Sequence, residues 1–74
     1  MIADINYFEE LMRNNNYNYT SLSKEMNLKP STLSSKIKGD SDLKFSEAIS
    51  IADILKMDKH QCLTCFFNQD LHKV

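Results

Sequence analysis

Apolar residues recur three or four positions apart along most of this chain, which is the spacing of one face of a helix. A first such stretch predicts a helix over 4–13, with Asp4 as a candidate N-cap. A second predicts a helix over 19–26, which Asn18 can cap. Asn27 follows it, and this residue type often ends helices because it tolerates the left-handed region.

The middle of the chain predicts a third helix over 30–38. Pro30 suits the first helical position because its missing N–H would be unpaired there, and Gly39 suits the position after the last turn. The segment 40–44 is polar and is expected to be a loop.

Two further helices follow. A fourth is expected to begin after Ser46, a good N-cap, and to bury one side made of Ala48, Ile49, Ile51, Ala52 and Leu55. A fifth is expected after Asp58, which forms a capping box with Gln61. No structure is assigned to the tail, 68–74. The residues expected to join the second, third and fourth helices in the core are Leu22, Leu33, Ile37 and Ile51.

The chain of 74 residues is expected to form one all-α domain over 1–74, a compact arrangement of five helices. One Gly and one Pro are too few for a sheet with many tight turns, which strengthens the helical interpretation. No signal peptide and no apolar run long enough to cross a membrane is visible, so a cytoplasmic location and no membrane partner are expected.

The formal net charge is −1, but the charge is unevenly distributed. Residues 19–38 carry four lysines against one glutamate, whereas the segments before and after them are acidic. A basic window of this kind is a candidate surface for a polyanion.

The basic window coincides with two short helices, 19–26 and 30–38, joined by a three-residue turn, which is the layout of a helix-turn-helix. An outward face of small hydroxyls and long cations suits entry into a DNA major groove. The candidate base contacts are Ser31, Ser34 and Ser35, and the candidate phosphate contacts are Lys29, Lys36 and Lys38.

The run LSKEMNLKPSTLSSKIKG, from Leu22 to Gly39, resembles the helix-turn-helix family of phage Cro and repressor proteins, also called XRE-type. The resemblance lies in Leu-Ser within the second helix, in Thr32-Leu33-Ser34 near the start of the third, and in the closing glycine. It implies a transcriptional regulator from a phage or prophage, acting in a bacterial host cell on double-stranded operator DNA. It further implies phosphate contacts at the start of the second helix, from Asn18 and Tyr19.

Phe66, Phe67 and Leu71 supply more apolar surface than a domain of this size is expected to bury, so they are predicted to form a homodimer interface. A dimer would double the DNA half-site. An alternative remains open, in which the same fold is an adaptor for a protein partner, such as an antirepressor or an inhibitor of a host defence enzyme.

Cys62 and Cys65 lie three residues apart, and zinc needs four ligands, for which the other candidates are His60 and His72. Two cysteines among apolar residues are better explained as small core side chains, so no metal and no cofactor is expected. No phosphate loop, paired-carboxylate site or nucleophile-and-base arrangement is apparent, and the chain is not expected to be an enzyme.

Overall fold

The computed structural model describes residues 3–71, and the side chains of 68–71 lie outside the description. The described part is all helical, with no strand. Its radius of gyration is 11.5 Å, close to the roughly 11 Å of a compact domain of this length. The helices are α1 (Ile5–Asn14), α2 (Tyr19–Glu25), α3 (Pro30–Lys38), α4 (Phe45–Ile54) and α5 (Lys59–Leu71).

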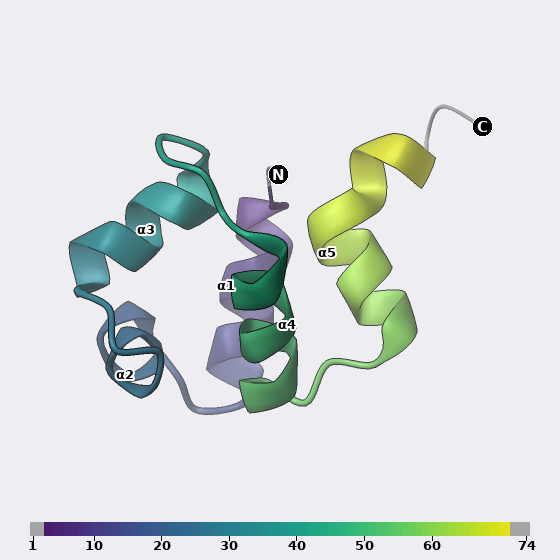
Figure 1. The fold of residues 1–74 in the computed structure, drawn as a ribbon. Helices are drawn as coiled ribbons and strands as arrows, with labels where there is room; N and C mark the ends of the chain where they lie inside the picture. The colour runs from purple at the N-terminus through teal and green to yellow at the C-terminus, as the bar shows by residue number, and fades with distance from the viewer. Residues whose placement is uncertain (1–2, 72–74) are drawn as a thin grey trace.

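The helices are arranged in three groups along the molecule (Figure 1). α1 and α4 lie in the middle, α2 and α3 lie on one side of them, and α5 lies on the other. α3 packs most extensively against α2, and α5 approaches α1. The backbone N–H of Asp4, just before α1, donates to the carbonyl of Cys65 in α5 at 2.7 Å.

The ends of the first three helices follow the predicted signals. Asp4 caps α1, and its side chain accepts a hydrogen bond from the Tyr7 N–H. Asn18 caps α2. Asn27 has φ 58° and Gly39 has φ 88°, so both residues adopt the left-handed conformation expected at these positions.

The start of α4 corrects the sequence prediction. The helix begins at Phe45, so Lys44 is the N-cap, and the expectation that Ser46 caps it is wrong. The physical reason is Glu47, whose carboxylate accepts the Lys44 N–H at 2.8 Å and closes the first turn two residues earlier. The segment 40–44, which the sequence predicts to be a polar loop, also contributes Leu43 to the core, where it is buried.

The predicted core is confirmed at its centre. Leu22, Leu33, Ile37 and Ile51 are fully buried, and they pack in one cluster with Phe8. The other members come from α1, α4 and α5 and from the segments beside them, namely Ala3, Leu11, Met12, Leu43, Ala48, Leu55, Cys65 and Phe66.

The outer side of α4 departs from the prediction. Ile49 was expected in the core, but 54% of it is exposed, as is 62% of Phe45. Ala48, Ile51 and Leu55 already fill the buried side, and Ile49 lies about a third of a turn away from the centre of these three at about 100° per residue. The Asp58–Gln61 capping box at the start of α5 is confirmed by two reciprocal hydrogen bonds of 3.0 and 2.8 Å. Across the described residues, no helix has the length and apolar character needed to cross a membrane.

Candidate nucleic-acid interface

α3 has two chemically distinct sides. Leu33 and Ile37 are fully buried and hold the helix against α2 and the core. The other side carries the three candidate base contacts, of which Ser31 is exposed, while Ser34 and Ser35 are half-buried. At these three positions the outer side of α3 is therefore small and polar.

Exposed lysines lie at the two ends of α3. Lys29 precedes the helix and Lys38 is its last residue, and both are exposed. Neither side-chain ammonium group makes a hydrogen bond or an ion pair within the described part of the chain. The ammonium group of a lysine is a compact charge on a flexible stem, so these two can reach a phosphate on either side of an inserted helix.

Lys36 is in a different situation. Its Nζ donates to the backbone carbonyl of Asp42 at 3.1 Å and lies 3.3 Å from Oε1 of Glu47. Only 15% of the Lys36 side chain is exposed. Its charge therefore already has partners within the chain.

Asn18 and Tyr19 both interact within the chain at the start of α2. The Asn18 side chain accepts the Ser21 N–H at 2.8 Å as part of a capping box. The Tyr19 hydroxyl donates to the Glu9 carboxylate at 3.0 Å, and burial together with this acceptor raises the pKa of Tyr19 to about 12. Tyr19 is therefore a neutral hydrogen-bond donor that joins α2 to α1.

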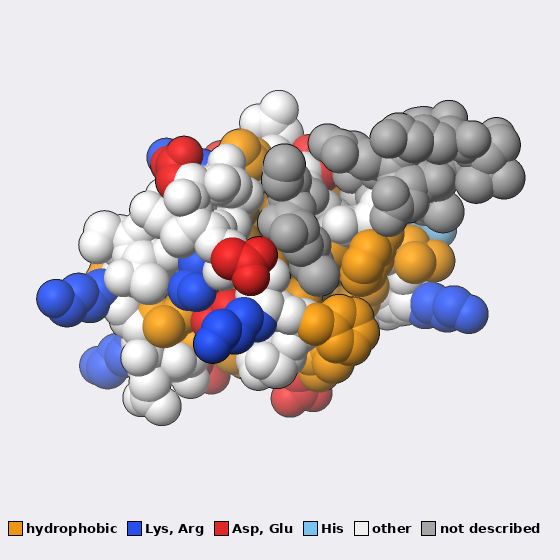
Figure 2. All heavy atoms as spheres, turned by 45° about the horizontal axis from the view of Figure 1, so that its top comes forward, with side chains coloured by type: hydrophobic (Ala, Val, Ile, Leu, Met, Phe, Trp, Pro, Cys, Tyr) orange, Lys and Arg blue, Asp and Glu red, His pale blue; other side chains and the backbone are white. Residues whose placement is uncertain are grey.

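The charged side chains are scattered over the face shown in Figure 2, and the apolar side chains gather at one end of it. Lysines dominate the end that carries α2 and α3, and carboxylates are interspersed with them. Asp40 and Asp42 lie in the loop after α3, so the basic character belongs to the two helices and not to this loop.

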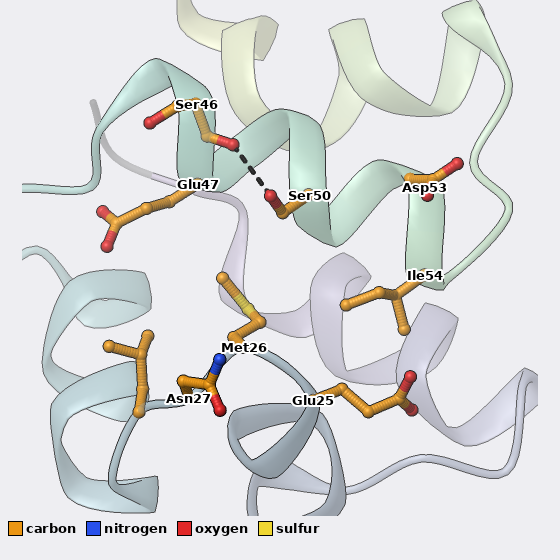
Figure 3. Close-up of a pocket in the computed structure, with 9 residues that line it drawn as sticks. Glu25, Met26, Asn27, Ser46, Glu47, Ser50, Asp53 and Ile54 are labelled. Carbon is orange, nitrogen blue, oxygen red and sulfur yellow. Dashed lines mark hydrogen bonds between the residues drawn. The ribbon is translucent and has the colours of Figure 1, made fainter.

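A cleft of about 450 Å³ lies between the α2–α3 turn and α4 (Figure 3). Glu25, Glu47 and Asp53 contribute carboxylates to it, and Met26 and Ile54 contribute apolar surface. Ser50 donates to the carbonyl of Ser46 at 3.1 Å. Three carboxylates make this cleft unsuitable for a phosphate.

A second hollow, of about 180 Å³, lies between α4 and α5 and is lined only by apolar side chains. We call it the apolar groove. The two large exposed apolar residues of the structure contribute to it, Phe45 and Ile49, which lie one helical turn apart. The remaining lining residues are Ala48, Ala52, Cys62, Phe66 and Phe67.

The three predicted dimer residues have different positions. Phe66 is 4% exposed and belongs to the core of this chain, so it has little surface to offer a second subunit. Phe67 is half-buried at the apolar groove. The side chain of Leu71 lies outside the described residues. The sequence prediction of this interface includes neither Phe45 nor Ile49, because the side of α4 that stays uncovered depends on how the other helices pack.

The remaining candidate chemistry lies in α5. Cys65 is fully buried and Cys62 is half-buried, and both are free thiols. Burial raises the pKa of the Cys65 thiol to about 12, which makes it a poor nucleophile and a poor metal ligand at neutral pH. His60 is exposed, and His72 lies outside the described residues. Within the described part of the chain, no group of three or more His, Cys, Asp or Glu is arranged to hold a metal ion.

Comparisons of this chain with family models, curated proteins and solved structures find no match.

Proposed function

We propose that this protein is a sequence-specific DNA-binding transcriptional regulator, in which α2 and α3 form a helix-turn-helix and α3 enters the major groove. The observation that carries the proposal is the division of α3 into two sides. Leu33 and Ile37 are fully buried, while the opposite side is polar, small and bounded by the exposed lysines at 29 and 38.

This division suits the known physical demands of groove binding. A major groove admits one α-helix, provided that the inserted side is not bulky. Serine hydroxyls can donate to or accept from base edges, which gives each of Ser31, Ser34 and Ser35 a weakly selective contact. Lysines beside the helix supply the phosphate contacts that set orientation and much of the affinity.

The resemblance of residues 22–39 to the Cro and repressor family supports the same function. It adds a biological setting, which is control of transcription in a phage or prophage. The left-handed conformation of Asn27 and Gly39 is consistent with this interpretation, because both residues bound the segment that would insert into DNA.

We further propose that the protein binds DNA as a homodimer, in which the two subunits contact each other at the apolar groove. One short recognition helix reads only a few base pairs, and a second copy doubles the site. Phe45 and Ile49 are the exposed apolar pair that a second subunit would cover, with Phe67 beside them. The groove lies between α4 and α5 and leaves the polar side of α3 free.

The second candidate function is an adaptor that binds another protein. The specific observation in its favour is again the apolar groove, because an exposed apolar patch marks a protein interface whether or not the partner is a second copy. The carboxylates of the cleft between the α2–α3 turn and α4 also suit a protein partner better than DNA.

Titration of a random-sequence duplex at several salt concentrations separates the two functions. If Lys29 and Lys38 of each subunit in a dimer meet phosphates, affinity falls roughly 100-fold between about 50 and about 200 mM salt. An adaptor with no DNA function would show no saturable binding or only a shallow dependence on salt, and either result would refute the proposal.

A further inference from the structure

The ammonium group of Lys36 lies where the end of α3, the following loop and the start of α4 meet. It donates to the Asp42 carbonyl in the loop at 3.1 Å and pairs with the Glu47 carboxylate in α4 at 3.3 Å. The two side chains are 15% and 19% exposed, respectively. Partly buried pairs are screened by salt much less than exposed ones, so this contact persists at ordinary ionic strength.

The helical register places Lys36 away from the proposed DNA side of α3. At about 100° per residue, it lies about 150° around the helix from the centre of Ser31, Ser34, Ser35 and Lys38. To reach a phosphate beside the groove, Lys36 would have to leave both of its partners. Lys38 faces no such cost, because it is exposed and belongs to the outward side.

Glu47 is held at the other end of the contact. The same Oε1 atom that faces Lys36 accepts the Lys44 N–H at 2.8 Å. Partial burial raises the pKa of the Glu47 carboxyl, but the Lys44 N–H and the Lys36 ammonium lower it by more, and the pKa lies below its ordinary value. The carboxylate is therefore charged at neutral pH and fixed to the first turn of α4.

We propose that Lys36 is a positioning residue, which holds the recognition helix at a set angle to α4 through Glu47 instead of contacting a phosphate. This rests on the proposed DNA-binding function of α3. Because α3 packs mainly against α2, the contact between Lys36 and Glu47 constrains α3 from a second direction. A recognition helix must be held firmly for its small hydroxyls to distinguish bases.

The test uses the salt dependence of binding to a random-sequence duplex and the base preference selected from a random pool. Lys36→Met and Glu47→Gln should both leave the salt slope unchanged and should both lower the enrichment of preferred sites, by roughly fivefold. Lys38→Met is the matched control, and it should flatten the slope by about one unit per bound subunit.

Two results would contradict this role of Lys36. If Lys36 met a phosphate, Lys36→Met would flatten the slope as much as Lys38→Met does. Glu47→Gln would then release the ammonium for DNA and strengthen binding to the random duplex. Either result would overturn the positioning role.

A DNA-free measurement keeps this inference separate from the proposed function. The denaturation midpoints of the parent, Lys36→Met, Glu47→Gln and the double variant form a double-mutant cycle. The loss in the double variant should be smaller than the sum of the two single losses, whereas additive losses would show that the two side chains do not interact. If the parent fails to bind duplex DNA, the DNA-binding proposal fails, and the cycle still decides whether the contact exists.

Discussion

The two ends of this molecule present different surfaces to their surroundings. At the α2–α3 end, the large apolar side chains Leu22, Leu33 and Ile37 are fully buried, and hydroxyls and lysines face outward. At the α4–α5 end, Phe45 and Ile49 remain largely exposed beside an apolar groove. A polar surface with cations suits a highly hydrated polyanion, and an apolar surface suits a partner that can also exclude water.

The contrast explains how one chain of this size could perform two tasks. Contacts with DNA phosphates weaken with salt, whereas burial of apolar surface is largely indifferent to moderate salt. The proposed assembly through α4–α5 and the proposed DNA recognition through α3 should therefore respond to different substitutions and different conditions.

The largest effect is expected from Leu33→Ala, which removes the buried anchor of α3. Truncating a buried leucine costs about 2–5 kcal/mol, which is a large part of the stability of a small domain. Chemical denaturation followed by circular dichroism measures the loss. Ser31→Ala on the exposed side of the same helix is the control, with an expected change within about 0.5 kcal/mol. A Leu33→Ala protein as stable as the parent would contradict the packing of α3.

Phe45→Ser is expected to separate the proposed dimer. Burying one phenylalanine contributes roughly 1.5–3 kcal/mol, and a symmetric interface loses two of them, so the dissociation constant should rise by at least about 100-fold. Sedimentation equilibrium of the parent and of Phe45→Ser measures this change, with Ser46→Ala on the same helix as the control. A parent that remains monomeric at high micromolar concentration would exclude the dimer and favour a different protein as the occupant of the groove.

Lys29→Gln with Lys38→Gln should affect only the other end of the molecule. Binding to all duplexes should weaken alike, and the salt slope should flatten by about two units per bound subunit, because two phosphate contacts are lost. Fluorescence anisotropy with a labelled random duplex provides the slope. Lys59→Gln, at the start of α5, removes an exposed lysine elsewhere and should leave the slope unchanged. If Lys59→Gln flattened the salt slope as much as Lys29→Gln with Lys38→Gln, DNA binding would not be centred on α3.

A smaller effect is expected from the pH dependence of Glu47. Its pKa in the folded protein lies below the ordinary value of 4.5, so it stabilises the fold above that pH, and the contribution is lost as the pH falls through the lowered pKa. The parent should therefore be more stable than Glu47→Gln near neutral pH, by up to about 1 kcal/mol. Unfolding free energies across this range should converge below pH 4.5, and a constant difference would show that the charge of Glu47 is not responsible.

The helices themselves could be predicted because their signals are local. Asn18, Asn27, Pro30 and Gly39 act through their own backbone preferences or through a neighbour three residues away, so their roles can be inferred without knowledge of the tertiary fold. The fully buried Leu33 and Ile37 follow from helical periodicity in the same way.

The remaining features depend on contacts between separate elements. The exposure of Ile49 depends on which side of α4 the other helices cover, and the burial of Leu43 depends on how the loop crosses the core. The pairing of Lys36 with Glu47 joins residues eleven positions apart on different helices. Charge and periodicity place Lys36 among the candidate phosphate contacts, but only the packed structure shows that its ammonium group has partners of its own.

Selection of bound DNA from a random duplex pool, at a stated salt concentration, tests the central claim most directly. We expect enrichment of one site that contains a half-site and its inverted repeat, about one helical turn or roughly 34 Å apart. Ser31→Ala, Ser34→Ala and Ser35→Ala should alter the enriched bases and leave affinity for random DNA nearly unchanged. A pool that shows no enriched sequence after repeated rounds would contradict sequence-specific DNA recognition by α3.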